Sequence, residues 1–269
     1  PAHFGPFNLP GRIRRVTIIH DLTPIMFPQW HDFFSRTLQK IFLPKIIKRS
    51  SLIIANSDNT LSDIINYYPA AYNKAIKIYP GIDPYYSANF QNIIKKEDFF
   101  LYTGTIEPRK DLTTLLEAYG LFRKKSNLKH KLIICGNKGW KNNEFYKRLD
   151  EHPYKKDIEL RGYVDKETLR NLYKTTAAFI YPSLYEGFGL PVTEAMSCGA
   201  PCIIARDSSL TEAGGTAAKY FNPGDAEDLY ERLKELTESE ELTGHMIKKG
   251  IDHSRQFSWK NYASILEEE

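Results

Sequence analysis

The sequence contains little of what marks secreted, membrane-spanning or metal-binding proteins. It has three cysteines, Cys135, Cys198 and Cys202, which cannot all pair, and none has a second Cys or His at the spacing of a zinc site. No apolar run approaches the roughly 20 residues that span a bilayer, and the N-terminus lacks the charged start and cleavage site of a signal peptide. These absences predict a cytoplasmic protein with reduced thiols that pack as small apolar groups.

A large excess of either charge is also lacking. The 37 Lys and Arg residues against 33 Asp and Glu give a formal net charge of +4, which is too small to predict nucleic-acid binding. The hydrophobic content of 42% in 269 residues is enough for one or two compact cores. Two domains are the expectation at this length.

Short β-rich runs alternate with helical patterns along most of the chain, which is typical of βαβ units and a parallel sheet. The predicted fold class is therefore α/β, with Rossmann-like parallel sheets. Predicted strands cover residues 14–21, 51–57, 76–80, 99–104, 130–136, 158–163, 177–183 and 201–205, and predicted helices cover residues 31–48 and begin near residues 58, 112, 145, 166 and 191.

The two halves of the chain differ in this pattern. Residues 1–85 supply three strands and two helices, which is part of a doubly wound domain, so we expect the chain to begin in the middle of its first domain. Gly, Pro and polar residues between Pro84 and Lys96 predict a boundary, and residues 86–256 form the second domain. Ser258 suits the N-cap of a last helix, and residues 257–269 are expected to return toward the first domain.

The stretch "SLYEGFGLPVTEAMSCGAP" places Glu186 and Glu194 on either side of a glycine-containing loop. Pro191 suits the first position of a helix and would put Glu194 in its first turn. The amides from Gly187 to Leu190 would then point outward and could hold an anionic or hydroxyl-rich ligand. The carboxylates of Glu186 and Glu194 could accept hydrogen bonds from sugar hydroxyls. The alternative is that Glu194 only complements the helix dipole and Glu186 is a solvated loop charge.

A second motif, "LYTGTIEPRKDLTTLLEAY", runs from a predicted buried strand through Gly104 into a loop with Arg109 and Lys110, followed by a helix. Two cations at a strand-to-helix turn could neutralise a diphosphate at the carboxyl edge of the sheet, where open α/β folds bind ligands. The alternative is an exposed basic turn.

Together, "YTGTIEPRKDL" and "EGFGLPVTEAMSCGAPCI", with "HD" earlier and "GYV" between them, resemble the motifs of retaining glycosyltransferases of the GT-B fold, family 4. The resemblance implies transfer of a sugar, with retention of configuration, from a UDP-, GDP- or ADP-sugar to an acceptor hydroxyl of a glycan or lipid-linked glycan. It assigns catalytic roles to His20 and Glu186 and donor binding to Gly104, Arg109, Lys110, Tyr163, Val164, Gly187, Phe188, Gly189, Leu190 and Glu194.

Within that assignment, the resemblance implies that Glu186 contacts the donor sugar and Glu194 holds the ribose hydroxyls. Arg109 and Lys110 would bind the diphosphate, and Tyr163 with Val164 would lie beside the base. His20 would lie near the reaction centre, at the cleft end of a buried strand; without the resemblance, a lone histidine there is more often structural.

Asp-x-Asp does not occur in the sequence, so we expect no metal and no other cofactor, with Arg109 and Lys110 supplying the positive charge. The first strand and glycine-rich loop of the relatives, which help to bind the acceptor, are also absent. We therefore expect donor binding to survive in this chain and acceptor specificity to lie mostly outside it.

Two other functions and one partner stay open. A nucleotide-sugar-binding module without catalysis is an alternative because the first domain looks incomplete, and a sugar phosphorylase would need a lysine-bound pyridoxal cofactor, for which no lysine stands out. Residues 31–50 mix phenylalanine and isoleucine with lysine and arginine. They could contact an anionic membrane surface, but a domain helix with an apolar core face and solvated lysines is the favoured explanation.

Overall fold

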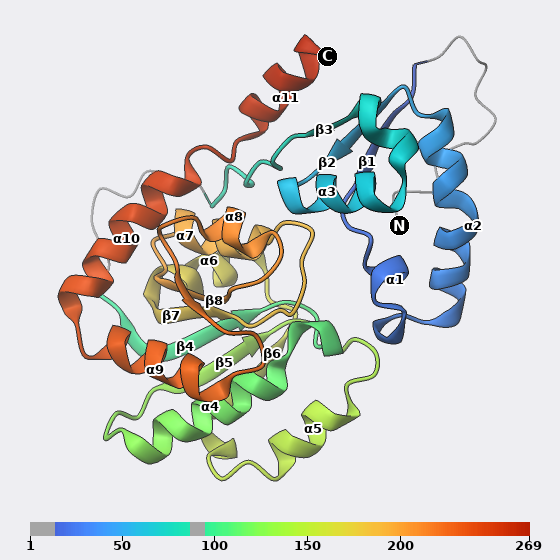
Figure 1. The fold of residues 1–269 in the computed structure, drawn as a ribbon. Coiled ribbons are helices and arrows are strands. Elements are labelled where there is room, and N and C mark those ends of the chain that lie inside the picture. Colours follow the sequence, from blue (N-terminus) through green and yellow to red (C-terminus); the bar gives the residue numbers. More distant parts are fainter. Residues whose placement is uncertain (1–13, 87–94) are drawn as a thin grey trace.

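The computed structural model describes residues 14–86 and 95–269. They form two lobes, each built on a parallel sheet (Figure 1). Most of the predicted boundary between Pro84 and Lys96 falls on residues 87–94, which lie outside the described residues.

The first lobe contains a three-stranded sheet in the order β1-β2-β3. Its core consists of apolar side chains from the sheet and from the helices that follow each strand. The elements are β1 (Val16–Ile19), α1 (Thr23–Met26), the 3-10 helix η1 (Pro28–Trp30), α2 (Phe33–Arg49), β2 (Leu52–Ala55), α3 (Asp58–Tyr67), the 3-10 helix η2 (Pro69–Lys74) and β3 (Ala75–Lys77).

The expectation that the strand before His20 is buried is wrong. β1 lies at one edge of the described sheet and pairs with β2. Val16 and Ile18 are exposed, whereas Ile19 is buried. Three of its four residues are apolar, as in an interior strand, but only alternate residues of β1 face the core.

The second lobe contains a six-stranded parallel sheet in the order β6-β5-β4-β7-β8-β9. Its strands are β4 (Glu97–Thr103), β5 (Lys131–Cys135), β6 (Ile158–Gly162), β7 (Thr176–Tyr181), β8 (Cys202–Ala205) and β9 (Lys219–Phe221). Its helices are η3 (Pro108–Lys110), α4 (Leu112–Lys125), α5 (Asn143–Asp150), η4 (Lys155–Asp157), α6 (Lys166–Thr175), α7 (Leu190–Ser197), α8 (Leu210–Gly214), α9 (Ala226–Thr237) and α10 (Glu240–Ser254).

Helices cover both faces of this sheet (Figure 1). α4 packs beside α5 and α9, and α7 packs beside α6, α8 and α10. The central strands β4, β7 and β8 carry near-continuous buried apolar residues, as expected for a parallel sheet covered on both sides. The loops after the carboxyl ends of β4 and β7 therefore rest on a rigid support.

Two segments of the described residues run between the lobes, near Ile82 and near Phe257, and they lie side by side. The Ile82 amide donates to the Phe257 carbonyl at 3.0 Å, and a Cβ on Gly81 would lie 2.3 Å from the Trp259 nitrogen. Beyond this point the last helix, α11 (Trp259–Glu268), leaves the second lobe and packs Tyr262 and Leu266 against the first (Figure 1).

Three features are absent from the residues that the structure describes, 14–86 and 95–269. No helix is both long and apolar enough to cross a bilayer. No group of three or more His, Cys, Asp or Glu side chains is arranged to hold a metal ion. Cys135, Cys198 and Cys202 are buried and free of disulfides.

Candidate active site

Arg109 and Lys110 lie directly after the carboxyl end of β4, in η3. The chain leaves the strand through Gly104, whose φ of +146° suits glycine, and its carbonyl lies so close to Gly136 that a Cβ there would be 2.0 Å away. Asp111 then caps α4 by accepting from the Thr114 amide. This turn fixes the backbone that carries the two cations.

Both cations contact Glu186. Arg109 Nη1 lies 2.7 Å from Glu186 Oε2, and Arg109 Nη2 lies 2.8 Å from Glu107 Oε1. Lys110 Nζ donates to Glu186 Oε1 and, at 2.7 Å, to the Tyr181 hydroxyl. The Lys110 side chain is 7% exposed and the Arg109 side chain 17%, so the pair is not an exposed basic turn.

These contacts determine the ionisation of Glu186. Burial raises the pKa of its carboxyl, but the charges of Lys110 and Arg109 and the hydrogen bond from Lys110 outweigh burial and lower the pKa to about 2. Glu186 and Glu107 in turn raise the pKa of Arg109, against the effect of burial. Arg109 and Glu186 are therefore both ionised near neutral pH and form an ion pair.

Hydrogen bonds tie the backbone around Glu186 to two neighbouring loops. The Leu184 amide donates to the Arg109 carbonyl at 2.9 Å. The Glu186 amide donates to Ser208 Oγ at 2.9 Å, and Ser209 Oγ donates to the Glu186 carbonyl at 2.7 Å. Glu186 is thus fixed at its main chain as well as its side chain.

The glycines after Glu186 permit two close approaches. A Cβ on Gly187 would lie 1.9 Å from the His20 carbonyl oxygen. Gly189 has a φ of +106° and is the N-cap of α7. The Phe188 side chain is buried against Tyr79 and Phe257, so only its backbone could meet a ligand, whereas the Leu190 side chain is exposed.

Glu194 does not lie in the first turn of its helix, as the sequence predicted. α7 begins at Leu190, one residue before Pro191, because Gly189 takes the left-handed cap conformation, so Glu194 is the fifth helical residue. Burial, and less strongly Asp83, raise the pKa of Glu194 to about 7, while Lys166 and a hydrogen bond with Tyr173 oppose this shift. A half-buried acid whose pKa lies near neutral pH is typical of functional sites.

His20 lies on the other side of the interface between the lobes. It follows β1 and is exposed, and its carbonyl is the group that Gly187 approaches. Asn56 Nδ2 lies 2.7 Å from His20 Nδ1. This contact with Asn56 orients the His20 ring.

Tyr163 and Val164 form the loop between β6 and α6. Tyr163 is 76% exposed, whereas Val164 packs on the edge of the core. The charge of Lys166, at the start of α6, acts on Glu194. The structure therefore gathers the predicted residues in two groups, with His20, Arg109, Lys110 and Glu186 around Gly187 and with Glu194 close to Lys166 and the β6–α6 loop.

Sequence reasoning missed Glu107 and Tyr181 as parts of this site. Glu107 is buried and pairs with Arg109, and the Tyr181 ring lies 4.9 Å from Lys110 Nζ. Glu107 stands two residues before Arg109 in the quoted motif, but a spacing of two in a loop does not indicate a pair. A buried Tyr at the end of β7 resembles ordinary core.

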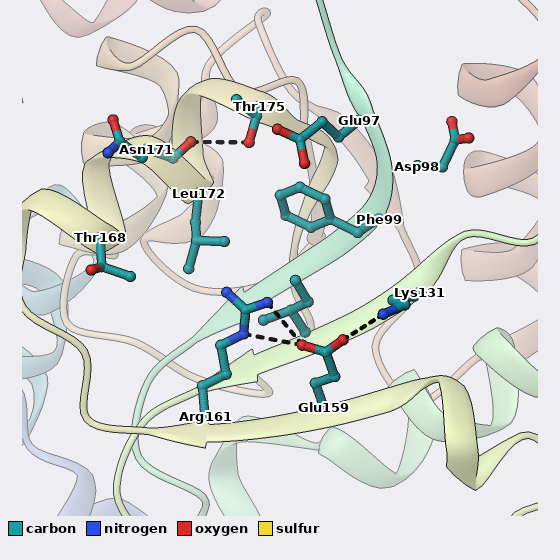
Figure 2. A pocket seen from close by; sticks show the side chains of 11 residues that line it. Glu97, Asp98, Phe99, Lys131, Glu159, Arg161, Thr168, Asn171, Leu172 and Thr175 are labelled. Atoms are coloured by element: carbon teal, nitrogen blue, oxygen red, sulfur yellow. Dashed lines mark hydrogen bonds and ion pairs between the residues drawn. The ribbon is translucent and has the colours of Figure 1, made fainter.

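A pocket of about 510 Å³ lies elsewhere, between α6 and the strands β4, β5 and β6 (Figure 2). Glu159, which lines this pocket, pairs with both Lys131 and Arg161 at 2.8 Å. Open α/β folds bind ligands at the carboxyl ends of strands, whereas most of the strand residues that line this pocket lie in the amino-terminal halves of their strands. We therefore place the candidate site at Gly187 and not in this pocket.

Residues 87–253 match the family described as "Glycosyl transferases group 1". The chain belongs to this family. The matched segment contains every candidate site residue from Gly104 to Glu194, whereas His20 lies before it. The family resemblance carried by the motifs is confirmed.

Two relatives of known name are similar in sequence to almost the whole of this chain. The chain is 32% identical over 270 residues to the O-antigen chain mannosyltransferase B of Escherichia coli, covering 96% of this chain and 71% of that protein. It is 26% identical over 277 residues to the serotype-specific mannosyltransferase WbdA of Escherichia coli, covering 96% of this chain and 33% of that protein. The chain thus spans only part of the length of these relatives.

Solved structures agree on the fold. The sucrose-phosphate synthase of Thermosynechococcus elongatus superposes with a TM-score of 0.79 at 17% identity, covering 94% of this chain and 66% of that one. The complex of Anabaena HepE with UDP-glucose gives a TM-score of 0.77 at 18% identity, covering 96% and 73%. The likeness confirms the predicted α/β GT-B architecture.

Proposed function

We propose that this chain is the donor-binding and catalytic part of a retaining hexosyltransferase. The enzyme moves a sugar from a nucleotide diphosphate to an acceptor hydroxyl of a glycan or lipid-linked glycan. By analogy with the relatives, the sugar is a mannosyl group. The observation that carries the proposal is the pair of cations, Arg109 and Lys110, held by Glu186 after the carboxyl end of β4. A guanidinium retains N–H groups after binding two carboxylates, and these can bind phosphate oxygens.

In this proposal the chemistry is a front-face displacement. The bond between the anomeric carbon and the diphosphate oxygen breaks, the acceptor oxygen bonds to that carbon on the same face, and the acceptor proton passes to the departing diphosphate. Arg109 and Lys110 stabilise the charge that develops on the diphosphate, which is the largest contribution expected from the protein. They supply the positive charge that a metal would otherwise bring.

Glu186 also has a role that the resemblance did not suggest. Its oxygens already contact Arg109 and Lys110, so we propose that it orients both cations in addition to contacting the sugar ring. Glu194 accepts hydrogen bonds from the ribose hydroxyls, and the loop with Tyr163 and Val164 lies beside the base. The first amides of α7 lack intrahelical acceptors and donate hydrogen bonds to the phosphate. His20 faces the sugar from the first lobe.

The test is binding and turnover of UDP, GDP and ADP, with and without attached sugars, in the presence of a chelator, by the wild-type chain and Glu194→Gln. We expect one nucleotide diphosphate sugar to bind and to be transferred or hydrolysed. Glu194→Gln should bind that nucleotide roughly tenfold more weakly, because a charge-assisted hydrogen bond contributes about 1.5–3 kcal/mol. Binding without any turnover would favour the alternative of a non-catalytic module, and equal affinity of the two chains would contradict the role of Glu194.

The pKa of Glu194 gives this test a second measurement. Ribose hydroxyls donate to the ionised carboxylate, so nucleotide affinity should rise as the pH increases from about 4.5 toward about 7 and then level off. Glu194→Gln should not show this rise. The phosphate of the nucleotide titrates in the same way with both chains, so its contribution cancels when the two pH profiles of affinity are subtracted. The stability of the free protein depends on pH in the opposite direction. Because the pKa of Glu194 is raised from 4.5 to about 7 on folding, its contribution to the free energy of unfolding is lost as the pH rises through 7.

We further propose that α2 contacts an anionic lipid surface that presents the acceptor. Phe33 and Phe34 are 77% and 69% exposed, and Ile41 on the same face is exposed too. Lys45 and Lys48 continue that face with positive charge. Apolar side chains flanked by cations suit a headgroup interface.

The double substitution Phe33→Ser and Phe34→Ser should reduce cosedimentation with vesicles of anionic lipid several-fold. Tyr72→Ser, which removes an equally exposed aromatic ring of the same lobe, serves as the matched control and should bind like the wild type. Equal binding of all three chains, or no preference for anionic over neutral vesicles, would show that α2 is an ordinary domain helix.

A further inference from the structure

The two residues that flank Glu186 both contact the first lobe through α3. The Tyr185 hydroxyl donates to Asp63 Oδ2 and accepts from Asn59 Nδ2, the latter at 2.9 Å. The Gly187 carbonyl accepts from Thr60 Oγ1 at 3.1 Å. Glu186 therefore lies between two anchors on a helix that belongs to the opposite lobe.

Tyr185 also contacts the phosphate-binding candidate on its own lobe. Its carbonyl accepts from Arg109 Nη1 at 3.0 Å, and its ring packs against Phe27 of the first lobe, with centroids 5.1 Å apart. One residue thus joins Arg109, through its main chain, to α3, through its side chain. A change in the distance between the lobes would move this connection.

Glu212, in α8, makes a second contact across the interface. Its Oε2 accepts from the Asp58 amide at 2.7 Å and its Oε1 from the Asn59 amide at 2.9 Å. These are the first two amides of α3, and Ser57 of the first lobe caps only the third, Thr60. A carboxylate at a helix N-terminus is stabilised by the dipole as well as by hydrogen bonds.

We propose that Tyr185 and Glu212 are positioning residues that hold the two lobes closed, so that His20 stays against the donor loop while the sugar is transferred. We call these two residues, with Asn59 and Asp63, the α3 latch. The inference rests on the proposed function for its kinetic consequence, but the closure itself is independent of it. The latch residues do not touch Lys110 or Glu194, and Tyr185 contacts Arg109 only through its main-chain carbonyl. Substitution of the Tyr185 side chain leaves that carbonyl in place, so the two roles can be tested separately.

The test combines Tyr185→Phe and Glu212→Gln with a measurement of the distance between the lobes. Each variant should lower kcat for the full reaction about tenfold, as expected for loss of a hydrogen bond to a charged group, with the dissociation constant of the nucleotide unchanged within twofold. Spin or fluorescent labels at one exposed site of each lobe should report a longer or broader distance. Tyr72→Phe, which removes an exposed hydroxyl away from the interface, should change neither quantity.

A double-mutant cycle of Tyr185→Phe with Asp63→Asn provides a readout that does not depend on activity. The effects on interlobe distance should be less than additive, because each substitution removes the same hydrogen bond. Unchanged interlobe distances in both Tyr185→Phe and Asp63→Asn would contradict the proposed latch, even if sugar transfer is never detected. Loss of nucleotide binding in step with kcat would show that these residues support the donor site and not closure.

Discussion

Replacing Glu186 with glutamine is expected to reduce sugar transfer roughly a hundredfold or more. The substitution removes the carboxylate that holds Arg109 and Lys110, and a preorganised group of this kind typically contributes two to three orders of magnitude to the rate. It also leaves two buried cations short of a partner, which costs on the order of 3–5 kcal/mol of unfolding free energy. Steady-state kinetics and chemical denaturation measure the two effects.

The pH dependence of stability distinguishes this explanation from simple damage. The folded pKa of Glu186, about 2, lies below the ordinary value of 4.5, so its stabilising effect is complete above 4.5 and is lost as the pH falls toward 2. The glutamine variant should not show that part of the acid loss. Glu159→Gln is the matched control, since Glu159 also pairs with two cations but lies at the other end of the sheet, and it should transfer sugar normally.

Replacing Arg109 with lysine should weaken binding of the nucleoside diphosphate by about ten- to a hundredfold and leave the nucleoside nearly unaffected. Lysine retains the charge but cannot contact Glu186, Glu107 and a phosphate oxygen together, because only the planar guanidinium has N–H groups in the required directions. Charge-assisted hydrogen bonds of about 1.5–3 kcal/mol give this range. Calorimetric titration of nucleoside, monophosphate and diphosphate measures it.

The same titrations contain their own checks. The difference between diphosphate and monophosphate should shrink as salt is added, because salt screens the interaction with phosphate. Arg123→Lys is the control, since Arg123 is also largely buried and paired with a carboxylate, that of Asp157, but lies in α4. If the nucleoside lost as much affinity as the diphosphate in Arg109→Lys, the assignment of Arg109 to the phosphates would be contradicted.

The alternation of apolar strands and amphipathic helices predicted most of the second lobe. The runs that became β4, β5, β7 and β8 are almost wholly buried, which is the pattern of a covered parallel sheet. β9 (Lys219–Phe221) was not predicted, since three residues are too short to show a period. α7 began one residue earlier than predicted because the conformation of Gly189 cannot be read from composition.

The candidate site was only partly predictable. Arg109, Lys110 and Glu186 were identified from two separate motifs, but no sequence rule indicated that one carboxylate contacts both cations, because the residues are 76 and 77 positions apart. The burial of Phe188 and the exposure of β1 depend on which elements pack nearby. Glu212 and Tyr185 reach the other lobe, and that arrangement follows from tertiary packing alone.

The two chain segments that run between the lobes, near Ile82 and near Phe257, determine how the lobes can separate. We call each of these segments a crossing. Sliding one lobe past the other would break the hydrogen bond between these crossings and force Gly81 against Trp259. Swinging about an axis along the crossings disturbs neither contact. The molecule should therefore open like a book, with this pair of segments as its spine.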